Sequence, residues 1–167
     1  MQNEYRSYEK IRISDLRRLA KIAQDDLIDL FCRKPDLGEI YRNRIICIAL
    51  CQGAALHYID GKNGVKDFDV WTFFREHKSR PFPYRRNVAR DFGTLRFGLS
   101  PDAKDFKGKR VDLIGRSIPY KSNENPIQTV QKYLAKSKNK TPKLLSQKAI
   151  VIIEPEEFLG TVAWPIK

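Results

Sequence analysis

The sequence predicts an α+β fold, because helical and strand patterns both occur along it and no internal repeat is present. Residues 16–31 place apolar side chains at helical spacing, whereas residues 45–51 and 149–153 are short apolar runs rich in β-branched residues. With 167 residues, 41% of them hydrophobic, the chain has enough material for one core. We therefore expect a single domain over residues 1–167.

The N-terminal third is expected to contain one helix and one buried strand. Ser14 is a typical N-cap residue, and the helical spacing that follows it ends near Cys32. The run Ile45–Cys51 is apolar throughout, as in a strand that is covered on both faces. It leads directly into Gln52 and Gly53, which predicts a tight turn after the strand.

A short helix and a second strand should follow this turn. Residues 54–58 contain good helix formers, and the glycines, asparagine and aspartate of residues 60–64 would end that helix. Residues 65–74 are then expected to form a strand. Residues 75–108 contain closely spaced prolines, aromatic residues and several arginines, so we expect a basic insertion of irregular structure with one short helix.

Three further elements are expected in the second half of the chain. Residues 109–115 are a strand candidate that would complete a core over about residues 45–115. This candidate carries Asp112, and because aspartate is disfavoured inside strands its presence needs a reason. Pro126 favours a helix that runs to about Ala135, and residues 149–153 follow a lysine-rich linker as a last strand.

The charge of the chain favours a polyanionic partner. Thirty-two lysines and arginines against 20 acidic residues give a formal net charge of +12, unusual for a protein that handles only neutral metabolites. The excess is concentrated in residues 75–90, with six basic residues and one acid, and in residues 131–148, with six lysines and no acid. A solvated surface is the alternative explanation for either cluster.

The cysteines and the hydropathy indicate a soluble protein of a reducing compartment. Cys32, Cys47 and Cys51 match neither a disulfide framework nor a zinc site, so we expect three small buried hydrophobic residues. No apolar run reaches the length of a membrane span. We therefore predict a cytoplasmic protein that does not enter a membrane.

Two carboxylates mark the candidate site. Asp67 and Asp69 lie one residue apart at the start of a strand candidate, and residues i and i+2 of a strand point to the same side. Two such charges are costly together unless a cation neutralises them. Mg²⁺, or Mn²⁺, prefers carboxylate oxygen and leaves coordination positions open for a phosphate. Trp71 has the same parity and is expected in the core or in a pocket wall.

A phosphate site is expected beside these carboxylates. Gly53 would let backbone amides approach a phosphate closely, and the helix that begins near Ala54 adds a favourable dipole. With Asp112 on a later strand, three carboxylates from two strands would hold two Mg²⁺ ions. Such an arrangement suits in-line nucleotidyl transfer to a hydroxyl group.

The same residues resemble a known family. The Gln52–Leu56 turn followed by Asp67–Val70 looks like the signature of the DNA polymerase beta-type nucleotidyltransferase superfamily, in particular its small bacterial members, which include minimal and defence- or toxin-type proteins. Val111–Ile114 is similar to the strand that carries the family's third carboxylate. The resemblance covers roughly residues 45–74 and 109–115.

This resemblance implies a nucleotidyltransferase-like mixed sheet flanked by helices. It implies that Asp67 and Asp69 bind both metal ions, and that Asp112 assists the metal on the nucleophile side and acts as general base. A nucleoside triphosphate would be held by Gln52, Gly53 and Ala54. The chain departs from the family at Gln52, where many relatives have a glycine.

Arginines are the further candidates for ligand contacts. Arg110 and Arg116 share the strand parity of Asp112 and would reach a phosphate, unless they are flanking surface arginines. The insertion combines arginines with aromatic residues, which suits single-stranded or looped RNA such as a tRNA end. The nucleic-acid candidates are Arg75, Arg80, Arg85, Arg86 and Arg90. The alternative is that the insertion buries its own aromatic residues over the sheet.

Other functions remain open at this point. A non-catalytic nucleic-acid-binding module with the same fold would show the same charge, and a protein-modifying nucleotidyltransferase would use a protein hydroxyl as acceptor. A regulatory protein would use its basic faces to bind an acidic protein partner. His57 lies beside apolar helix residues and is expected to pack or hydrogen bond rather than to bind a ligand.

Overall fold

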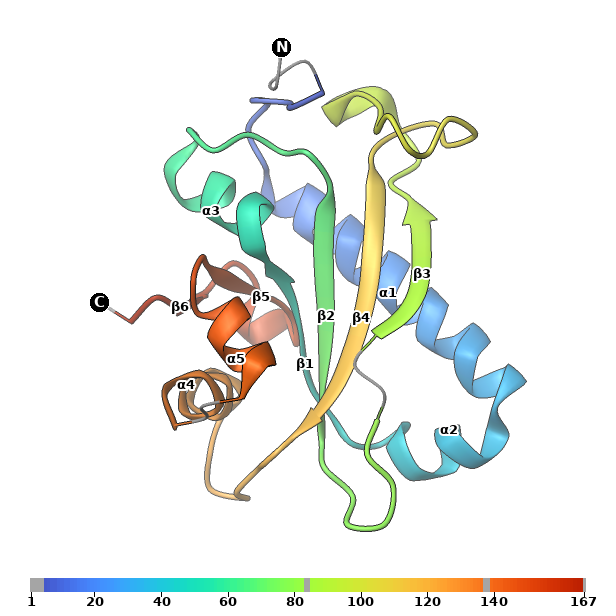
Figure 1. Cartoon of the computed structure of the whole chain (residues 1–167), viewed down its shortest axis with the longest axis vertical. Helices are drawn as coiled ribbons and strands as arrows, with labels where there is room; N and C mark the ends of the chain where they lie inside the picture. The colour runs from blue at the N-terminus through green and yellow to red at the C-terminus, as the bar shows by residue number, and fades with distance from the viewer. Residues whose placement is uncertain (1–4, 83–84, 137–138, 167) are drawn as a thin grey trace.

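The chain folds as an α+β structure around a mixed β-sheet (Figure 1). The computed structural model describes residues 5–82, 85–136 and 139–166, without the side chains of residues 85–87 and 136. The strands are β1 (Ile45–Cys51), β2 (Phe68–Arg75), β3 (Arg85–Asp91), β4 (Arg110–Ile118), β5 (Ile150–Glu154) and β6 (Val162–Trp164). The helices are α1 (Ile13–Arg33), α2 (Pro35–Tyr41), α3 (Gln52–Asp60), α4 (Pro126–Lys136) and α5 (Lys140–Leu145), with 3₁₀ turns η1 (Leu95–Phe97) and η2 (Glu156–Phe158).

The sheet has the strand order β3-β4-β2-β1-β5-β6. β2 and β4 pair in parallel, and the four other neighbouring pairs are antiparallel. The parallel pair means that β2 and β4 both begin at the same end of the sheet, near α3 (Figure 1). The residues at the starts of these two strands are therefore neighbours.

Two hydrophobic cores lie on the two faces of the sheet. α1 crosses one face, where Leu19 packs in a cluster with Leu50 and Leu113. Helices α4 and α5 lie against the other face, where Phe73 and Leu145 are buried. β1 is buried on both faces, as its uninterrupted apolar run predicts.

The expected order of helices and strands is confirmed for the core, with shifts at the boundaries. The Ile45–Cys51 strand has the predicted limits. The N-cap prediction at Ser14 is wrong: α1 begins at Ile13, and a carboxylate oxygen of Asp15 accepts a hydrogen bond of 2.7 Å from the Arg12 N–H. β2 starts at Phe68 rather than at residue 65, because a turn precedes it.

Several elements were not predicted. β3 lies inside the insertion, where irregular structure was expected, because pairing with β4 orders a segment that has no strong apolar pattern. α5 occupies part of the predicted lysine-rich linker. α2 and β6 are additional short elements. Within the described ranges, no helix is long and apolar enough to cross a membrane.

Candidate active site

The sheet register brings the end of β1 and two aspartates side by side. Asp69 of β2 is the register partner of Asp112 in parallel β4, and Cys51 at the end of β1 pairs with Asp69 from the other side. Neighbouring strands lie about 4.8 Å apart. Gln52 and Gly53, which are the first residues of α3 rather than a separate turn before it, and both carboxylates therefore meet at one end of the sheet.

Asp67 reaches the same region from outside the strand. It lies in the turn before β2, so its position is not set by strand alternation as expected. Its Oδ1 accepts a hydrogen bond of 2.7 Å from the Ser100 hydroxyl, and the Ser100 oxygen in turn accepts one of 3.0 Å from the Arg110 N–H. Ser100 is buried and thus ties Asp67 to the start of β4.

The carboxylates influence one another electrostatically. Burial raises the pKa of Asp69 to about 7, and the negative charges of Asp112 and Asp67 contribute to the same rise. The pKa of Asp67 is also raised, mainly by burial, although the Ser100 hydrogen bond acts in the opposite direction. The site therefore favours a compensating cation.

Arg110 supplies one such cation within the chain. Its Nε donates a hydrogen bond of 2.6 Å to Asp112 Oδ1, and its guanidinium also pairs with Asp102 at 3.1 Å. This confirms that Arg110 and Asp112 share one face of β4. The Arg110 guanidinium is bound to Asp112 and Asp102, so a phosphate could contact it only in place of one of these carboxylates.

The donor chemistry suits a hard divalent cation, but the carboxylates are not gathered around one point. Asp67, Asp69 and Asp112 offer oxygen ligands from two neighbouring segments. Among the described residues, no group of three or more His, Cys, Asp or Glu side chains is placed to hold a metal ion. The hydrogen bonds to Ser100 and Arg110 explain this spread, because each draws one carboxylate towards another partner.

Gln52 adopts an unusual backbone conformation at the turn. Its φ is 64°, in the left-handed region that favours glycine. Its N–H donates a hydrogen bond of 3.1 Å to the Ala149 carbonyl, so this amide is not directed at a ligand. The position thus has a backbone geometry that glycine adopts most easily, although the side chain is glutamine.

Gly53 lies in a closely packed position in the first turn of α3. A Cβ at this position would lie 2.9 Å from Asn63 Nδ2, which donates a hydrogen bond of 2.9 Å to the Gly53 carbonyl. The same hypothetical Cβ would lie 4.0 Å from Lys148 Nζ. The helix N-terminus and a lysine ammonium therefore adjoin each other, which is favourable for binding an anion.

A cavity of about 400 Å³ opens beside Asp69, and we call it the Asp69 cavity. Trp71 is 4% exposed and forms part of its wall while stacking on Phe73, so both expected roles apply. The Lys148 charge lies close enough to oppose the rise in the pKa of Asp69. The lining residues are Gln52, Asp69, Trp71, Ile114, Leu144, Gln147 and Lys148.

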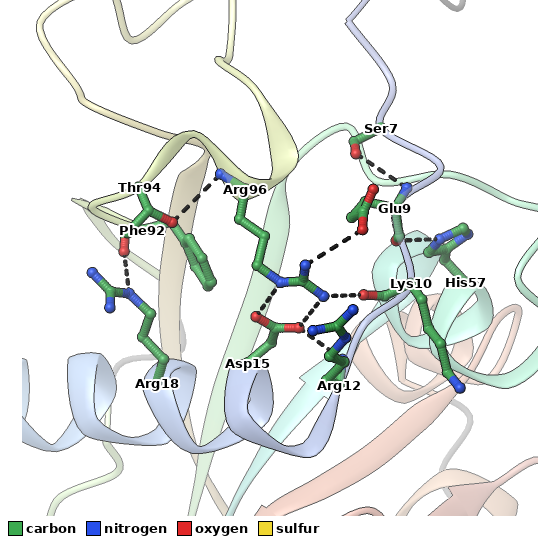
Figure 2. A network of polar contacts seen from close by, with 10 residues as sticks. All are labelled: Ser7, Glu9, Lys10, Arg12, Asp15, Arg18, His57, Phe92, Thr94 and Arg96. Carbon is green, nitrogen blue, oxygen red and sulfur yellow. Dashed lines mark hydrogen bonds and ion pairs between the residues drawn. The ribbon is translucent and has the colours of Figure 1, made fainter.

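The N-terminal segment and α1 fasten the insertion through hydrogen bonds (Figure 2). Arg96 donates hydrogen bonds of 2.8 and 3.1 Å to the two carboxylate oxygens of Asp15, and one of 2.6 Å to the Lys10 carbonyl. Arg18 of α1 donates to the Phe92 carbonyl. These bonds hold the segment that carries Ser100.

His57 fastens α3 to the same N-terminal segment. Its Nδ1 accepts a hydrogen bond of 2.9 Å from the Gly64 N–H, so its Nε2 carries the proton and donates to the Glu9 carbonyl at 2.9 Å. This confirms the predicted packing role of His57 (Figure 2). The turn between α3 and Asp67 is positioned by this imidazole.

Two of the candidate nucleic-acid-binding arginines, Arg75 and Arg90, contact other parts of the protein. Arg90 pairs with Asp26 at 3.2 Å and Asp29 at 2.7 Å, both on α1 and therefore on the sheet face opposite Asp69 and Asp112. Arg75 donates a hydrogen bond of 2.6 Å to the Asn43 carbonyl. Arg80 is exposed. The side chains of Arg85 and Arg86 lie outside the described part of the structure.

Most described aromatic residues of the insertion are buried. Phe82, Phe92 and Phe97 are at most 3% exposed, and Phe92 and Phe97 pack on Phe68 beneath the start of β2. This favours the alternative in which the insertion folds over the sheet and buries its own rings. Tyr84 lies outside the described residues.

One cysteine prediction is wrong. Cys47 and Cys51 are buried as expected, but Cys32 is exposed.

Two site residues were missed from the sequence. Ser100 lies 33 positions from Asp67, and nothing in its local sequence indicates the hydrogen bond. Lys148 lies two residues before the start of β5, and its sequence context indicates only a basic cluster. The predicted strand over residues 149–153 could have indicated Lys148. If this strand pairs antiparallel with β1, it begins beside Gln52 and Gly53, and Lys148 lies just before it.

Arg116 is separated from the aspartates. It lies on the same face of β4 as Asp112 but four residues further on, about 13 Å away at about 3.3 Å per residue. It lines a different cavity.

No protein-family model matches the sequence, and no curated protein or solved structure is detectably similar to the chain.

Proposed function

We propose that this protein is a metal-dependent nucleotidyltransferase that moves a nucleotide from a nucleoside triphosphate to a hydroxyl acceptor. The observation that carries this proposal is the register Cys51–Asp69–Asp112, which places a glycine-containing turn, a helix N-terminus and two carboxylates at one end of the sheet. Asp67 adds a third carboxylate through its bond to Ser100. These groups match the requirements of triphosphate binding and metal-assisted transfer.

Asp67, Asp69 and Asp112 would hold Mg²⁺ or Mn²⁺, after Asp67 and Asp112 turn from Ser100 and Arg110 towards Asp69. When bound, the metal supplies charge neutralisation of the triphosphate and activation of the acceptor hydroxyl. Arg110, once released from Asp112, would pair with a phosphate through the part of its guanidinium that does not contact Asp102. In the protein alone, Asp67 is therefore held by a hydrogen bond from Ser100 and Asp112 by an ion pair with Arg110.

The turn after β1 and Lys148 would bind the triphosphate. Lys148 Nζ adjoins the first turn of α3, so a phosphate there is met by an ammonium and by backbone N–H groups of Gly53 and Ala54. The Asp69 cavity places Trp71 and Gln147 beside this position, as walls for the rest of the nucleotide. Gln52 contributes its side chain and not its backbone amide.

In the transfer itself, the acceptor oxygen bonds to the α-phosphorus while the bond from that phosphorus to the bridging oxygen breaks. Pyrophosphate leaves with the electron pair of that bond. The proton of the acceptor hydroxyl passes to the Asp112 carboxylate, which acts as general base. Asp69 lies beside Asp112 in the register, and because its pKa is raised to about 7 a bound cation would favour its ionised form.

A transfer assay tests this proposal. The protein is incubated with Mg²⁺, each labelled nucleoside triphosphate in turn, and total RNA or cell lysate. We expect label transfer and pyrophosphate release that are lost in Asp69→Asn and Asp112→Asn. Asp36→Asn, an exposed carboxylate of α2, is the matched control and should retain activity. Absence of transfer with every triphosphate, or activity that survives Asp69→Asn, contradicts the proposal.

One observation favours a second candidate, a non-catalytic nucleic-acid-binding protein with the same fold. Asp112 is already paired with Arg110, and the described carboxylates are not gathered to hold a metal. In that case, RNA binding would be unaffected by Mg²⁺ and by Asp69→Asn, and no pyrophosphate would be released. The same incubation therefore separates the two functions.

A further inference from the structure

The Arg110 guanidinium lies between two carboxylates that come from different segments. Its Nε donates a hydrogen bond of 2.6 Å to Asp112 Oδ1 in β4, and its Nη1 donates one of 3.1 Å to Asp102 Oδ2 in the loop before that strand. The two carboxylates therefore bind different nitrogens of one side chain. Either contact can break while the other remains.

Asp102 also acts on the candidate site through its charge. The hydrogen bond to Asp112 is the largest cause that raises the pKa of Arg110, and the negative charges of Asp112, Asp102 and Asp67 act in the same direction. Burial is the main cause that raises the pKa of Asp67, and the Asp102 charge contributes to that rise. Asp102 therefore lies close to the three candidate carboxylates, although no role was expected for it from the sequence.

The short segment from Ser100 to Asp102 binds both the main chain and the side chain of Arg110. The Ser100 oxygen accepts a hydrogen bond of 3.0 Å from the Arg110 N–H, and the Ser100 hydroxyl donates one of 2.7 Å to Asp67. Asp102 follows two residues later and pairs with the guanidinium. Because Ser100 is buried, this segment holds Asp102 at a fixed place beside the start of β4.

A cavity of about 240 Å³ lies beside this ion pair, and we call it the Asp102 cavity. Asp102 and Arg110 line it together with Ala89 of β3. Ala89 is the register partner of Asp112, so its short side chain lies on the same face of the sheet as that carboxylate. The Arg110 side chain, which is 32% exposed, therefore has space to move from Asp112 towards Asp102.

We propose that Asp102 is a positioning residue that retains the Arg110 guanidinium when Asp112 turns to a metal ion. This role rests on the proposed nucleotidyl transfer. In the protein alone, Arg110 bridges the two carboxylates and acts as the counter-ion of Asp112. After the exchange its Nη1 stays on Asp102, and its Nε and Nη2 are directed at two oxygens of one phosphate.

The test measures metal binding without triphosphate or acceptor, so that the readout is independent of catalysis. Mn²⁺ is the probe, and the electron paramagnetic resonance signal of the unbound ion gives its dissociation constant. We expect Arg110→Gln to bind Mn²⁺ about fivefold more tightly, because Asp112 has lost its internal counter-ion. Asp102→Asn should bind Mn²⁺ about threefold more weakly, because Arg110 then pairs with Asp112 alone.

A double variant separates positioning from a general effect of charge. Loss of the Asp102 charge would weaken the binding of any nearby cation, with or without Arg110. If Asp102 acts through Arg110, Asp102→Asn should change the Mn²⁺ affinity by less than about 1.5-fold in the Arg110→Gln background. The same threefold loss in both backgrounds overturns the proposal.

Two exposed residues of the Asp102 cavity provide matched controls. Asp105→Asn and Lys104→Gln remove one negative and one positive charge from the same lining. Each should change the Mn²⁺ affinity by less than about 1.5-fold, because an exposed charge without a bridging contact is screened by solvent. Effects as large as those of Asp102→Asn and Arg110→Gln overturn the proposal.

The outcome is distinguishable from failure of the proposed function. If no transfer is detected but the double variant shows that Asp102 acts through Arg110, the positioning role stands and the reaction assignment fails. If transfer depends on Asp69 and Asp112 but Arg110→Gln binds Mn²⁺ as the wild type does, the positioning role fails alone. If Asp69→Asn binds Mn²⁺ as tightly as the wild type, the metal lies elsewhere and both assignments fail.

Discussion

The insertion (residues 75–108) and the lysine segment (residues 131–148) flank the candidate site and use their cations differently. Arg90 and Arg96 of the insertion pair with carboxylates of α1. In the lysine segment Lys132 pairs with Glu124 at 3.3 Å, whereas Lys148 is exposed beside Asp69. A cation that is paired with the protein's own acids contributes to stability, whereas an exposed cation beside a cavity is available to a ligand.

The difference arises from the position of the acidic residues. α1 presents Asp15, Asp26 and Asp29 to the insertion, whereas residues 131–148 contain no acid. Both segments have a similar surplus of basic residues in the sequence. Composition alone therefore predicts ligand-binding cations in both segments. Whether a cation is structural or available to a ligand depends on which acidic residues the fold places beside it.

The largest expected effect tests the structural role of the insertion. Arg96→Gln leaves Asp15, whose side chain is 5% exposed, without its bidentate partner. We expect the free energy of unfolding to fall by about 3 kcal/mol, measured by urea denaturation. Lys143→Gln, an exposed residue of α5, is the matched control and should change it by less than about 0.5 kcal/mol. Equal effects would remove the distinction between the two segments.

The second prediction concerns Asp69, which lies between the two segments. Its pKa is about 7 in the folded protein and about 3.9 in an unfolded chain, so the folded state holds a proton more tightly and stability falls as pH rises from about 4 to 7. Asp69→Asn removes this pH-dependent loss of stability, because asparagine does not ionise. We expect the metal-free variant to be more stable than the wild type by about 2 kcal/mol at pH 8 and by much less at pH 4.

Thermal unfolding at the two pH values, in buffer with a chelator, measures this difference. The variant should lose transfer activity although it is more stable. A stability gain that is equal at both pH values, or largest at pH 4, contradicts the burial of an ionised carboxylate at this position.

The third prediction sharpens the role of the lysine segment. Lys148→Ala removes the ammonium that adjoins the first turn of α3. We expect the KM for the triphosphate to rise about tenfold, which corresponds to about 1.4 kcal/mol, with little change in unfolding free energy. Lys143→Ala provides the control within the same segment. A loss of stability without a change in KM would assign Lys148 a structural role.

The smallest expected effect concerns the turn itself. Gln52→Gly removes the cost of a left-handed side chain, about 1 to 2 kcal/mol, and adds the flexibility of glycine to the unfolded chain. We expect a net gain of about 0.5 kcal/mol in unfolding free energy, measured by urea denaturation. A clear loss of stability would show that contacts of the glutamine side chain outweigh the backbone strain.

The sequence predicted those features that depend on local pattern. β1 was predicted at its observed limits because seven consecutive apolar residues suit a strand buried on both faces. The parity of Arg110 with Asp112 follows from strand alternation and is confirmed. The prediction of Ser14 as the N-cap of α1 was wrong. The Asp15 carboxylate accepts a hydrogen bond from the Arg12 N–H, and the helix begins at Ile13, ahead of Ser14.

Features that depend on distant pairing were not predictable from one sequence. The partners of Arg90 lie 61 and 64 positions away, and β3 forms only because β4 offers an edge for it. Ser100 reaches Asp67 because Arg96 fastens the insertion to α1. Each of these contacts links segments whose proximity is set by the assembled sheet and not by local propensity.

The most direct test of the central claim is a crystal structure with Mg²⁺ and a non-hydrolysable nucleoside triphosphate. We expect metal density between Asp67, Asp69 and Asp112, the triphosphate against Gly53 and Lys148, and Asp112 released from its guanidinium partner. A structure in which the nucleotide binds elsewhere, with no metal at the three carboxylates, would contradict the account.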